Sequence, residues 1–209
     1  MSASASSLAS PLGARAGGAE STSITVRRSA LSHSSVSPFP LYALFDTALG
    51  TAAVAWNDRG IVRTLLPEPT ASAARARLAR RLPHAAEAAP PEQVRRLIGD
   101  VVDLLQGDLV SLEWVPIDDT AVPELDRRVY AAARTIPPGS TRTYGDVARL
   151  IGDATLARRV GEALGRNPFP IVVPCHRVLA AGGRTGGFSA RGGTETKMQL
   201  LRIEGAVLL

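Results

Sequence analysis

The chain has 209 residues, 45% of them hydrophobic and 21% charged, which is enough for one compact domain or two small ones. No uninterrupted apolar run approaches the roughly 20 residues that cross a bilayer, and the single cysteine excludes an internal disulfide and a cysteine-rich zinc cage. We therefore expect a soluble, intracellular protein.

The positive charge is concentrated in the C-terminal part. The formal net charge is +5; residues 124–209 carry 13 Lys+Arg against 7 Asp+Glu, whereas residues 1–123 carry 11 against 12. Every basic residue except Lys197 is an arginine, whose planar guanidinium suits phosphate groups and base edges. This distribution favours a nucleic-acid-binding face, although ordinary solvation of an arginine-rich chain explains it equally well.

The first 37 residues are rich in Ser and Ala and show no hydrophobic periodicity. We expect residues 1–37 to be a disordered extension, because such a segment cannot bury enough apolar surface to fold. The same composition is typical of organellar transit peptides, and a tail without a targeting role explains it as well.

Residues 38–118 have the pattern of a small α+β domain. Short apolar runs separated by turn residues are followed by two stretches with helical spacing and a further apolar run. The pattern predicts antiparallel strands at Leu41–Asp46, Thr51–Asn57 and Ile61–Leu66, helices at Thr70–Leu82 and Glu92–Leu105, and another strand at Leu112–Ile117. Because no constellation of side chains here suggests chemistry, we interpret this part as a supporting domain.

Residues 119–209 have the pattern of a helical DNA-binding domain. After a linker, apolar residues at helical spacing predict an amphipathic helix that ends before Pro137-Pro138-Gly139. Two further short helices, Tyr144–Ile151 and Leu156–Leu164, flank the tight turn Gly152-Asp153, and this arrangement is typical of a helix-turn-helix.

The second of these short helices carries Arg158 and Arg159, and Arg166 lies just past its end. Small residues, among them Ala157 and Gly161, lie beside the arginines. Such a surface allows a close approach to DNA, and it equally allows close packing against another helix.

A stiff loop holds the only cysteine. Residues 167–178 contain three prolines, which restrict the backbone, so Cys175 lies on a peptide with little freedom. A free thiol is mostly protonated at neutral pH; His176 can take that proton directly or through a water, and Glu204 is a candidate to orient the imidazole. The residues alone equally allow a buried structural cysteine beside a hydrogen-bonded histidine.

Several separated motifs together resemble one family. Pro174–Val178 (PCHRV), preceded by Asn167-Pro168 and followed by Gly187-Phe188-Ser189, closely resembles the active-site segment of the O6-alkylguanine-DNA alkyltransferases. Further segments agree with that family in order: Ile136–Gly145, Ala157–Gly161 and Lys197–Gly205. The resemblance runs from Leu125 to Ala206.

The resemblance implies an α+β fold. It implies an N-terminal ribonuclease-H-like domain, a small antiparallel sheet with helices at residues 38–118, and a C-terminal winged helix-turn-helix alkyltransferase domain at residues 119–209. It also implies a DNA-repair protein, a monomer without cofactor, that binds double-stranded DNA through the minor groove and rotates an O6-alkylguanine out of the helix. The alkyl group then passes irreversibly to the protein in a single turnover. Such a protein would be cytoplasmic and nucleoid-associated, or nuclear or organellar if residues 1–37 are a targeting segment.

The resemblance also implies the roles of the catalytic residues. Cys175 would be the nucleophile, His176 would deprotonate it through a water, and Glu204 would hold His176 in the right tautomer. Asn167 would brace the turn that carries the thiol. Tyr144 would place its hydroxyl near guanine N3, where charge builds on the leaving base.

For the substrate and the DNA, the resemblance implies a second set of residues. In the base pocket, Tyr144 and Phe188 would contribute side chains, and Val178 and Ser189 would contribute backbone. Arg158 would fill the gap left by the extruded base. The rest of the DNA contact would come from Ala157, Arg159, Gly161 and Arg166.

The sequence departs from the family pattern at three points. Phe188 stands where the family often has tyrosine, and residues 189–193 are longer than the shortest form of that loop. Residues 1–123 contain no cysteine, so we expect no structural zinc of the kind some relatives bind. The main alternative function is a winged-helix DNA-binding regulator with a cysteine sensor and no repair activity. An alkyltransferase-like protein would lack the cysteine, and a cysteine hydrolase would need an oxyanion hole that no motif indicates.

Overall fold

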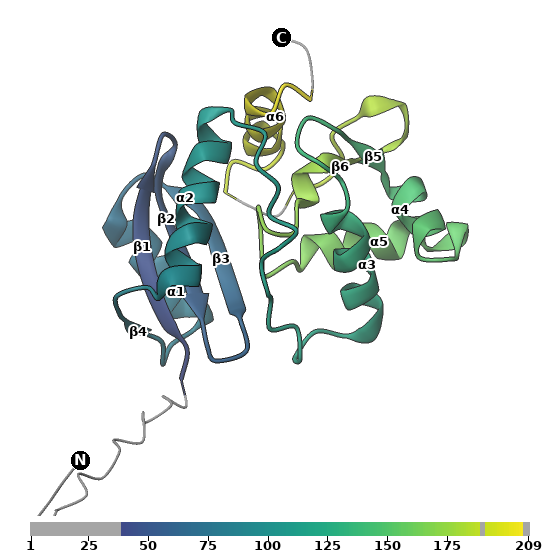
Figure 1. Ribbon diagram of the computed structural model, residues 1–209. Coiled ribbons are helices and arrows are strands. Elements are labelled where there is room, and N and C mark those ends of the chain that lie inside the picture. The colour runs from purple at the N-terminus through teal and green to yellow at the C-terminus, as the bar shows by residue number, and fades with distance from the viewer. Residues whose placement is uncertain (1–38, 189–190, 207–209) are drawn as a thin grey trace, which may run out of the picture. The chain divides into compact units, whose positions relative to one another are not determined.

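Figure 1 shows the computed structural model, which describes residues 39–188 and 191–206. These residues lie in one compact unit. The expected disorder of residues 1–37 falls outside the described part. No helix among the described residues is long and apolar enough to cross a membrane.

The N-terminal sheet is built around two hairpins. Strand β1 (Leu41–Thr47) pairs antiparallel with β2 (Gly50–Trp56), which pairs antiparallel with β3 (Ile61–Glu68). The short β4 (Ala86–Glu87) runs parallel to β1, so the strand order is β3-β2-β1-β4. The three predicted strands are confirmed, but the sheet is mixed rather than purely antiparallel, because two residues of β4 offer no alternating pattern to read.

The strand expected at Leu112–Ile117 is wrong. This segment touches the sheet through one isolated parallel bridge between Ile61 and Ile117. The Ile61 amide donates to the Pro116 carbonyl at 2.9 Å, and the Asp118 amide donates to the Ile61 carbonyl at 2.8 Å. Pro116 has no amide proton, so the ladder does not extend.

Helices cover both faces of the sheet. Consecutive strand residues point to opposite faces, so Ala53 packs against Leu78 of α1 (Ala71–Arg81), whereas Val54 lies in the cluster that contains the apolar face of α2 (Glu92–Gln106). In Figure 1, α2 lies across the face of the sheet turned toward the viewer. This two-sided cover explains why β2 is an almost unbroken run of buried residues. Both predicted helices are confirmed.

The C-terminal part is helical. Helices α3 (Glu124–Arg134), α4 (Tyr144–Leu150) and α5 (Ala157–Gly165) pack against one another, and α6 (Thr194–Ile203) follows later in the chain. The turn after α4 contains Gly152, whose φ of 91° lies in the left-handed region that favours glycine. The predicted helix-turn-helix is therefore confirmed, with a 3₁₀ turn at residues 154–156 leading into α5.

The start of α4 has a capping box. The Thr143 hydroxyl accepts from the Asp146 amide at 3.0 Å, and the Thr143 amide donates to the Asp146 carboxylate at 2.7 Å. These bonds satisfy amides that a helix start leaves unpaired. They fix the position of Tyr144, the first residue of α4. Strand β5 (Arg142–Thr143) pairs in parallel with β6 (Val178–Leu179), and this pair joins the helix-turn-helix to the segment after Cys175.

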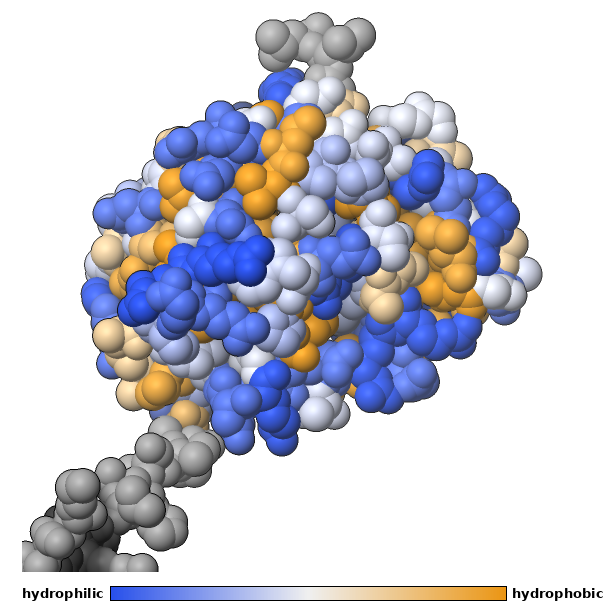
Figure 2. All heavy atoms as spheres, viewed as in Figure 1, coloured by the Kyte–Doolittle hydropathy of each residue, from blue (hydrophilic) through white to orange (hydrophobic). Residues whose placement is uncertain are grey.

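Hydrophilic residues cover most of the face seen in Figure 2, with smaller hydrophobic patches between them. The core beneath is continuous across the chain: one cluster of buried residues contains Val54 of the sheet, Leu97 of α2, Val129 of α3 and Val173. Val173 belongs to the loop of residues 167–178 that carries Cys175, called the active-site loop below. The loop that carries the cysteine is thus packed between the two halves.

Candidate active site

The loop before the cysteine is held in a closed turn. The Asn167 side-chain amide donates to the Val173 carbonyl at 2.9 Å, and its oxygen accepts from the Phe169 amide at 2.8 Å. The Val173 amide donates to the Phe169 carbonyl at 2.7 Å. Within the turn, Ile171 has a φ of 75°, which a β-branched residue rarely adopts. The surrounding bonds therefore impose this backbone conformation.

The N-terminal sheet supports the same loop directly. From β3, the Thr64 amide donates to the Pro168 carbonyl at 3.1 Å. The Thr64 hydroxyl donates to the Pro170 carbonyl at 2.7 Å. A two-point attachment of this kind fixes both the position and the tilt of the turn. Sequence reasoning did not find it, because Thr64 has no local signal that distinguishes it from any other strand residue.

Cys175 begins a 3₁₀ turn that runs to Arg177, and its side chain is 8% exposed. Burial raises the pKa of the thiol, and a hydrogen bond with Asn167, the charge of Lys197 and nearby backbone amides offset part of that rise. The resting thiol is therefore protonated, and it needs a base to become a nucleophile.

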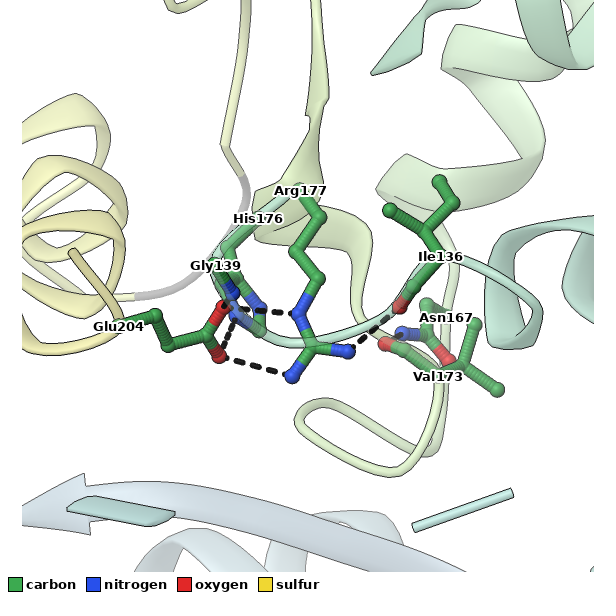
Figure 3. A network of polar contacts seen from close by, with 7 residues as sticks. All are labelled: Ile136, Gly139, Asn167, Val173, His176, Arg177 and Glu204. Carbon is green, nitrogen blue, oxygen red and sulfur yellow. Dashed lines mark hydrogen bonds and ion pairs between the residues drawn. The ribbon is translucent and has the colours of Figure 1, made fainter. Parts of the chain in front are cut away.

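His176, the next residue after Cys175, has the properties of a base. Its side chain is 1% exposed, and its Nε2 lies 2.8 Å from Glu204 Oε1 (Figure 3). Burial lowers the pKa of His176, although the hydrogen bond to Glu204 acts in the other direction. A neutral imidazole donates Nε2–H to the carboxylate and leaves the lone pair on Nδ1. Among the described residues Nδ1 is buried without a hydrogen-bond partner, so it is free to accept a proton.

Arg177 completes a buried ionic cluster that sequence reasoning missed. Its Nε and Nη2 donate to the two oxygens of Glu204 at 2.8 and 2.9 Å, and its Nη1 donates to the Ile136 carbonyl at 2.7 Å (Figure 3). Burial would raise the pKa of Glu204, but hydrogen bonds from His176 and Arg177 outweigh it and lower that pKa to about 2. The Glu204 carboxylate therefore stays charged. The one sequence signal that could have pointed to Arg177 as part of this cluster was its position directly after Cys175-His176.

Lys197 is a second residue whose place in the site was not foreseen. Its side chain is fully buried, and Nζ donates to the Val178 carbonyl at 2.6 Å. Nζ lies 5.7 Å from the centroid of the Tyr144 ring and 6.0 Å from that of Phe188. Burial lowers the pKa of Lys197 to about 8, and the neighbouring Cys175 acts in the opposite direction. The ammonium thus fixes the backbone of Val178 and places positive charge near the thiol.

In front of Cys175 lies a cavity of about 570 Å³, a size typical of small-molecule sites. Tyr144, Phe188 and Gly161 of α5 are among its lining residues. Burial raises the pKa of Tyr144, so its hydroxyl remains a donor. The Tyr144 hydroxyl lies 3.5 Å from the Gly187 carbonyl. Val178, expected to contribute backbone to this pocket, is not among the described residues that line the cavity, and its carbonyl accepts from Lys197. Ser189, also expected in this pocket, lies outside the described residues.

Of the expected DNA-contacting arginines, two lie on the open surface of α5. Arg158 is 91% exposed and Arg159 58% exposed, and both contact the Glu162 carboxylate, at 3.2 and 3.5 Å. Arg166 differs, because its guanidinium binds the buried carboxylate of Asp126 in α3 through two bonds of 3.1 and 3.0 Å. The Arg166 guanidinium is therefore paired with a buried carboxylate of the protein itself.

A family model described as "6-O-methylguanine DNA methyltransferase, DNA binding domain" matches residues 124–206. The methylated-DNA–protein-cysteine methyltransferase of Methanothermobacter thermautotrophicus is 34% identical over 155 residues, which make up 74% of this chain and 80% of that protein. The chain belongs to the O6-methylguanine DNA methyltransferase family. The resemblance seen in the sequence motifs is thereby confirmed.

Solved structures of the family share the fold. A crystal structure of Mycobacterium tuberculosis OGT in complex with DNA aligns with a TM-score of 0.63 and 30% identity, covering 79% of this chain and 93% of that one.

A second relative was matched by sequence. The methylated-DNA–protein-cysteine methyltransferase of Mycolicibacterium paratuberculosis is 51% identical over 81 residues, a match that spans 39% of this chain and 48% of that protein. This family member is accordingly a methylated-DNA–protein-cysteine methyltransferase, a protein that repairs O6-alkylguanine in DNA.

Proposed function

We propose that this methyltransferase moves the alkyl group from O6 of guanine in double-stranded DNA onto Cys175, once per protein molecule and irreversibly. The observation that carries the proposal is the state of His176. Its Nε2 is bound to Glu204 while its buried Nδ1 is unpartnered, and the residue before it in the chain is Cys175, which lines a cavity. A base without a partner beside a protonated nucleophile is the arrangement that general-base catalysis requires.

We infer the following reaction from this arrangement. The thiol proton passes through a water to His176, and Glu204 stabilises the imidazolium that forms. The sulfur attacks the alkyl carbon on the side opposite O6, so the new C–S bond forms as the C–O6 bond breaks and its electron pair passes to guanine. Tyr144 donates a hydrogen bond to N3 as negative charge builds on the base. The product is a thioether, which is too poor a leaving group to be turned over.

DNA has to deform for this chemistry. A thiol on a closed, mostly buried turn cannot reach O6 inside a stacked duplex, so the nucleotide must rotate into the cavity beside Tyr144. We place α5 in the minor groove, with small residues at Ala157 and Gly161 allowing close approach and Arg158 filling the vacated place in the stack. Arg159 would contact phosphate, and we give Arg166 a structural role because of its pairing with Asp126.

DNA binding is supported by the related Mycobacterium tuberculosis protein, which was crystallised with DNA. We further propose that the two domains divide the work. In this chain, residues 38–118 support the loop through Thr64, while residues 119–209 carry the thiol, the base and the exposed arginines. We propose that the chain acts as a monomer without a metal or cofactor, in the compartment that holds the DNA.

The test mixes the protein with a duplex oligonucleotide containing one O6-methylguanine. We expect the intact protein mass to rise by one methylene group, on the peptide that contains Cys175, with one equivalent at most. A duplex with unmodified guanine and the variant Cys175→Ala are the controls. Methyl transfer by Cys175→Ala, or several equivalents per molecule, would contradict the proposal.

A further inference from the structure

A second cavity meets the first at the reactive sulfur. Its volume is about 310 Å³, and it lies between β3, α1 and the active-site loop. Cys175, Phe188, Leu164 and Gly165 line both cavities, so the sulfur stands at their junction. A purine that occupies the larger cavity beside Tyr144 would present its O6 substituent at this junction. The smaller cavity is thus positioned to receive whatever extends beyond the reacting carbon.

The second cavity is lined by arginines. Arg63, Arg77, Arg81 and Arg166 contribute to its wall, and no acidic residue in the described part of the chain lines it. Two of the four already have a carboxylate partner: Arg77 pairs with Glu68 at 2.9 Å, a carboxylate that Arg191 also binds, and Arg166 pairs with Asp126.

The other two arginines have no carboxylate within the ion-pair distance among residues 39–188 and 191–206. The Nε of Arg63 is buried and has no hydrogen-bond partner there. Burial lowers the pKa of Arg63, and the positive charge of Arg81 lowers it further. Arg81 is exposed and therefore hydrated, but leaving the buried Arg63 Nε without an acceptor is costly, and an anion between the two guanidinium groups would satisfy it.

The cavity also has apolar walls. Leu65, Leu66 and Pro170 line it together with Phe188. In an in-line displacement the sulfur, the reacting carbon and O6 lie on one line. The rest of a longer alkyl group must therefore extend from that carbon to the side of this line. Apolar walls near the sulfur and guanidinium groups in the same cavity suit a chain or ring that ends in a negative charge.

We propose that this cavity is a subsite for O6-alkyl groups that end in a carboxylate, and that Arg63 and Arg81 bind the carboxylate. The inference rests on the proposed function and specifies its substrate class. The transfer is unchanged: the C–S bond forms, the C–O6 bond breaks with its electron pair passing to guanine, and guanine gains the proton that the thiol lost. The carboxylate stays on the transferred group.

A DNA phosphate is the other anion that arginines bind, but it fits this site less well. The Arg63 Nε is buried, so a phosphate that stays part of a DNA strand reaches it less readily than a carboxylate carried into the cavity of about 310 Å³ on the substrate's own alkyl group. Free guanine bases without a backbone separate the two sources. O6-(4-carboxybenzyl)guanine and O6-(4-carbamoylbenzyl)guanine have nearly the same shape and differ in charge.

The experiment measures the second-order rate of Cys175 alkylation by each base, by intact-protein mass, and takes the ratio of carboxylate to amide. Intrinsic reactivity cancels when that ratio is compared between variants. We expect Arg81→Ala and Arg63→Gln each to lower the ratio about tenfold, the effect of losing one charge-assisted hydrogen bond. Arg80→Ala is the matched control, since Arg80 precedes Arg81 on α1 and does not line this cavity. It should leave the ratio unchanged.

Three outcomes would overturn the inference. If duplex O6-methylguanine is not repaired, the proposed function fails and the subsite fails with it. If the duplex is repaired but the ratio is the same in all four proteins, the proposed function stands and the subsite does not exist. If Arg81→Ala slows repair of the methylated duplex while the free-base ratio stays constant, these arginines bind DNA phosphate instead.

Discussion

Replacing Glu204 by glutamine tests the buried charge cluster behind Cys175. The side chain keeps its shape but loses its charge, and the guanidinium of Arg177 is left buried without a counter-ion. The pKa of Glu204 is lowered from 4.5 to about 2 in the folded protein. At about 1.4 kcal/mol per pKa unit, this shift corresponds to about 3 kcal/mol of stability at neutral pH. For a domain of this size, that loss lowers Tm by about 6–12 °C.

The pH dependence follows from the sign of the same shift. Because the folded pKa of Glu204 lies below the unfolded value, its contribution is fully present above about pH 4.5 and is lost as the pH falls toward about 2. Wild type should therefore lose about 3 kcal/mol more than Glu204→Gln across that window.

Urea unfolding followed by circular dichroism, repeated from pH 7 to pH 2, measures both quantities. Glu195→Gln is the matched control, since Glu195 is an exposed carboxylate in the first turn of the same helix, α6. We expect the control to unfold like wild type. If Glu204→Gln loses no more stability than Glu195→Gln at neutral pH, the cluster does not hold the fold together and the reasoning is refuted.

Three more predictions concern transfer itself. Arg158→Ala should slow repair of duplex DNA much more than reaction with free O6-benzylguanine, because only the duplex needs a side chain in the stack; equal losses would remove Arg158 from that role. Thr64→Val removes the donor to the Pro170 carbonyl. We expect a loss of about 1 kcal/mol in the free energy of unfolding and slower alkyl transfer, even from a free base. An unchanged transfer rate would show that the β3 contact does not position the thiol. Lys197→Met removes a positive charge that lowers the pKa of Cys175, so the pH–rate profile should move to higher pH; a profile that stays in place would count against this electrostatic role.

The sequence by itself determined the local elements and singled out the candidate nucleophile, Cys175. Alternating and helical apolar patterns depend on neighbours a few residues apart, which is why three strands of the sheet, both N-terminal helices and the helix-turn-helix could be read directly. The prolines before Cys175 likewise restrict only their own backbone and that of the preceding residue, so the stiffness of this loop could also be read from the sequence. The family motif at Pro174–Val178 added the reaction type, because it joins a cysteine, a histidine and an arginine in one short run.

Only the tertiary structure decided which distant groups meet. The sequence had suggested Glu204 as the partner of His176, but not that Arg177 binds the same carboxylate across 27 residues or that Lys197 reaches Val178 across 19. Arg166 turned to Asp126 instead of to the open face of α5. A buried charge is satisfied by whatever group packing brings to it, and packing is a property of the whole chain rather than of a window along it. The arginine-lined cavity beside Cys175 has the same origin, since β3 and α1 meet the active-site loop only after the chain has folded.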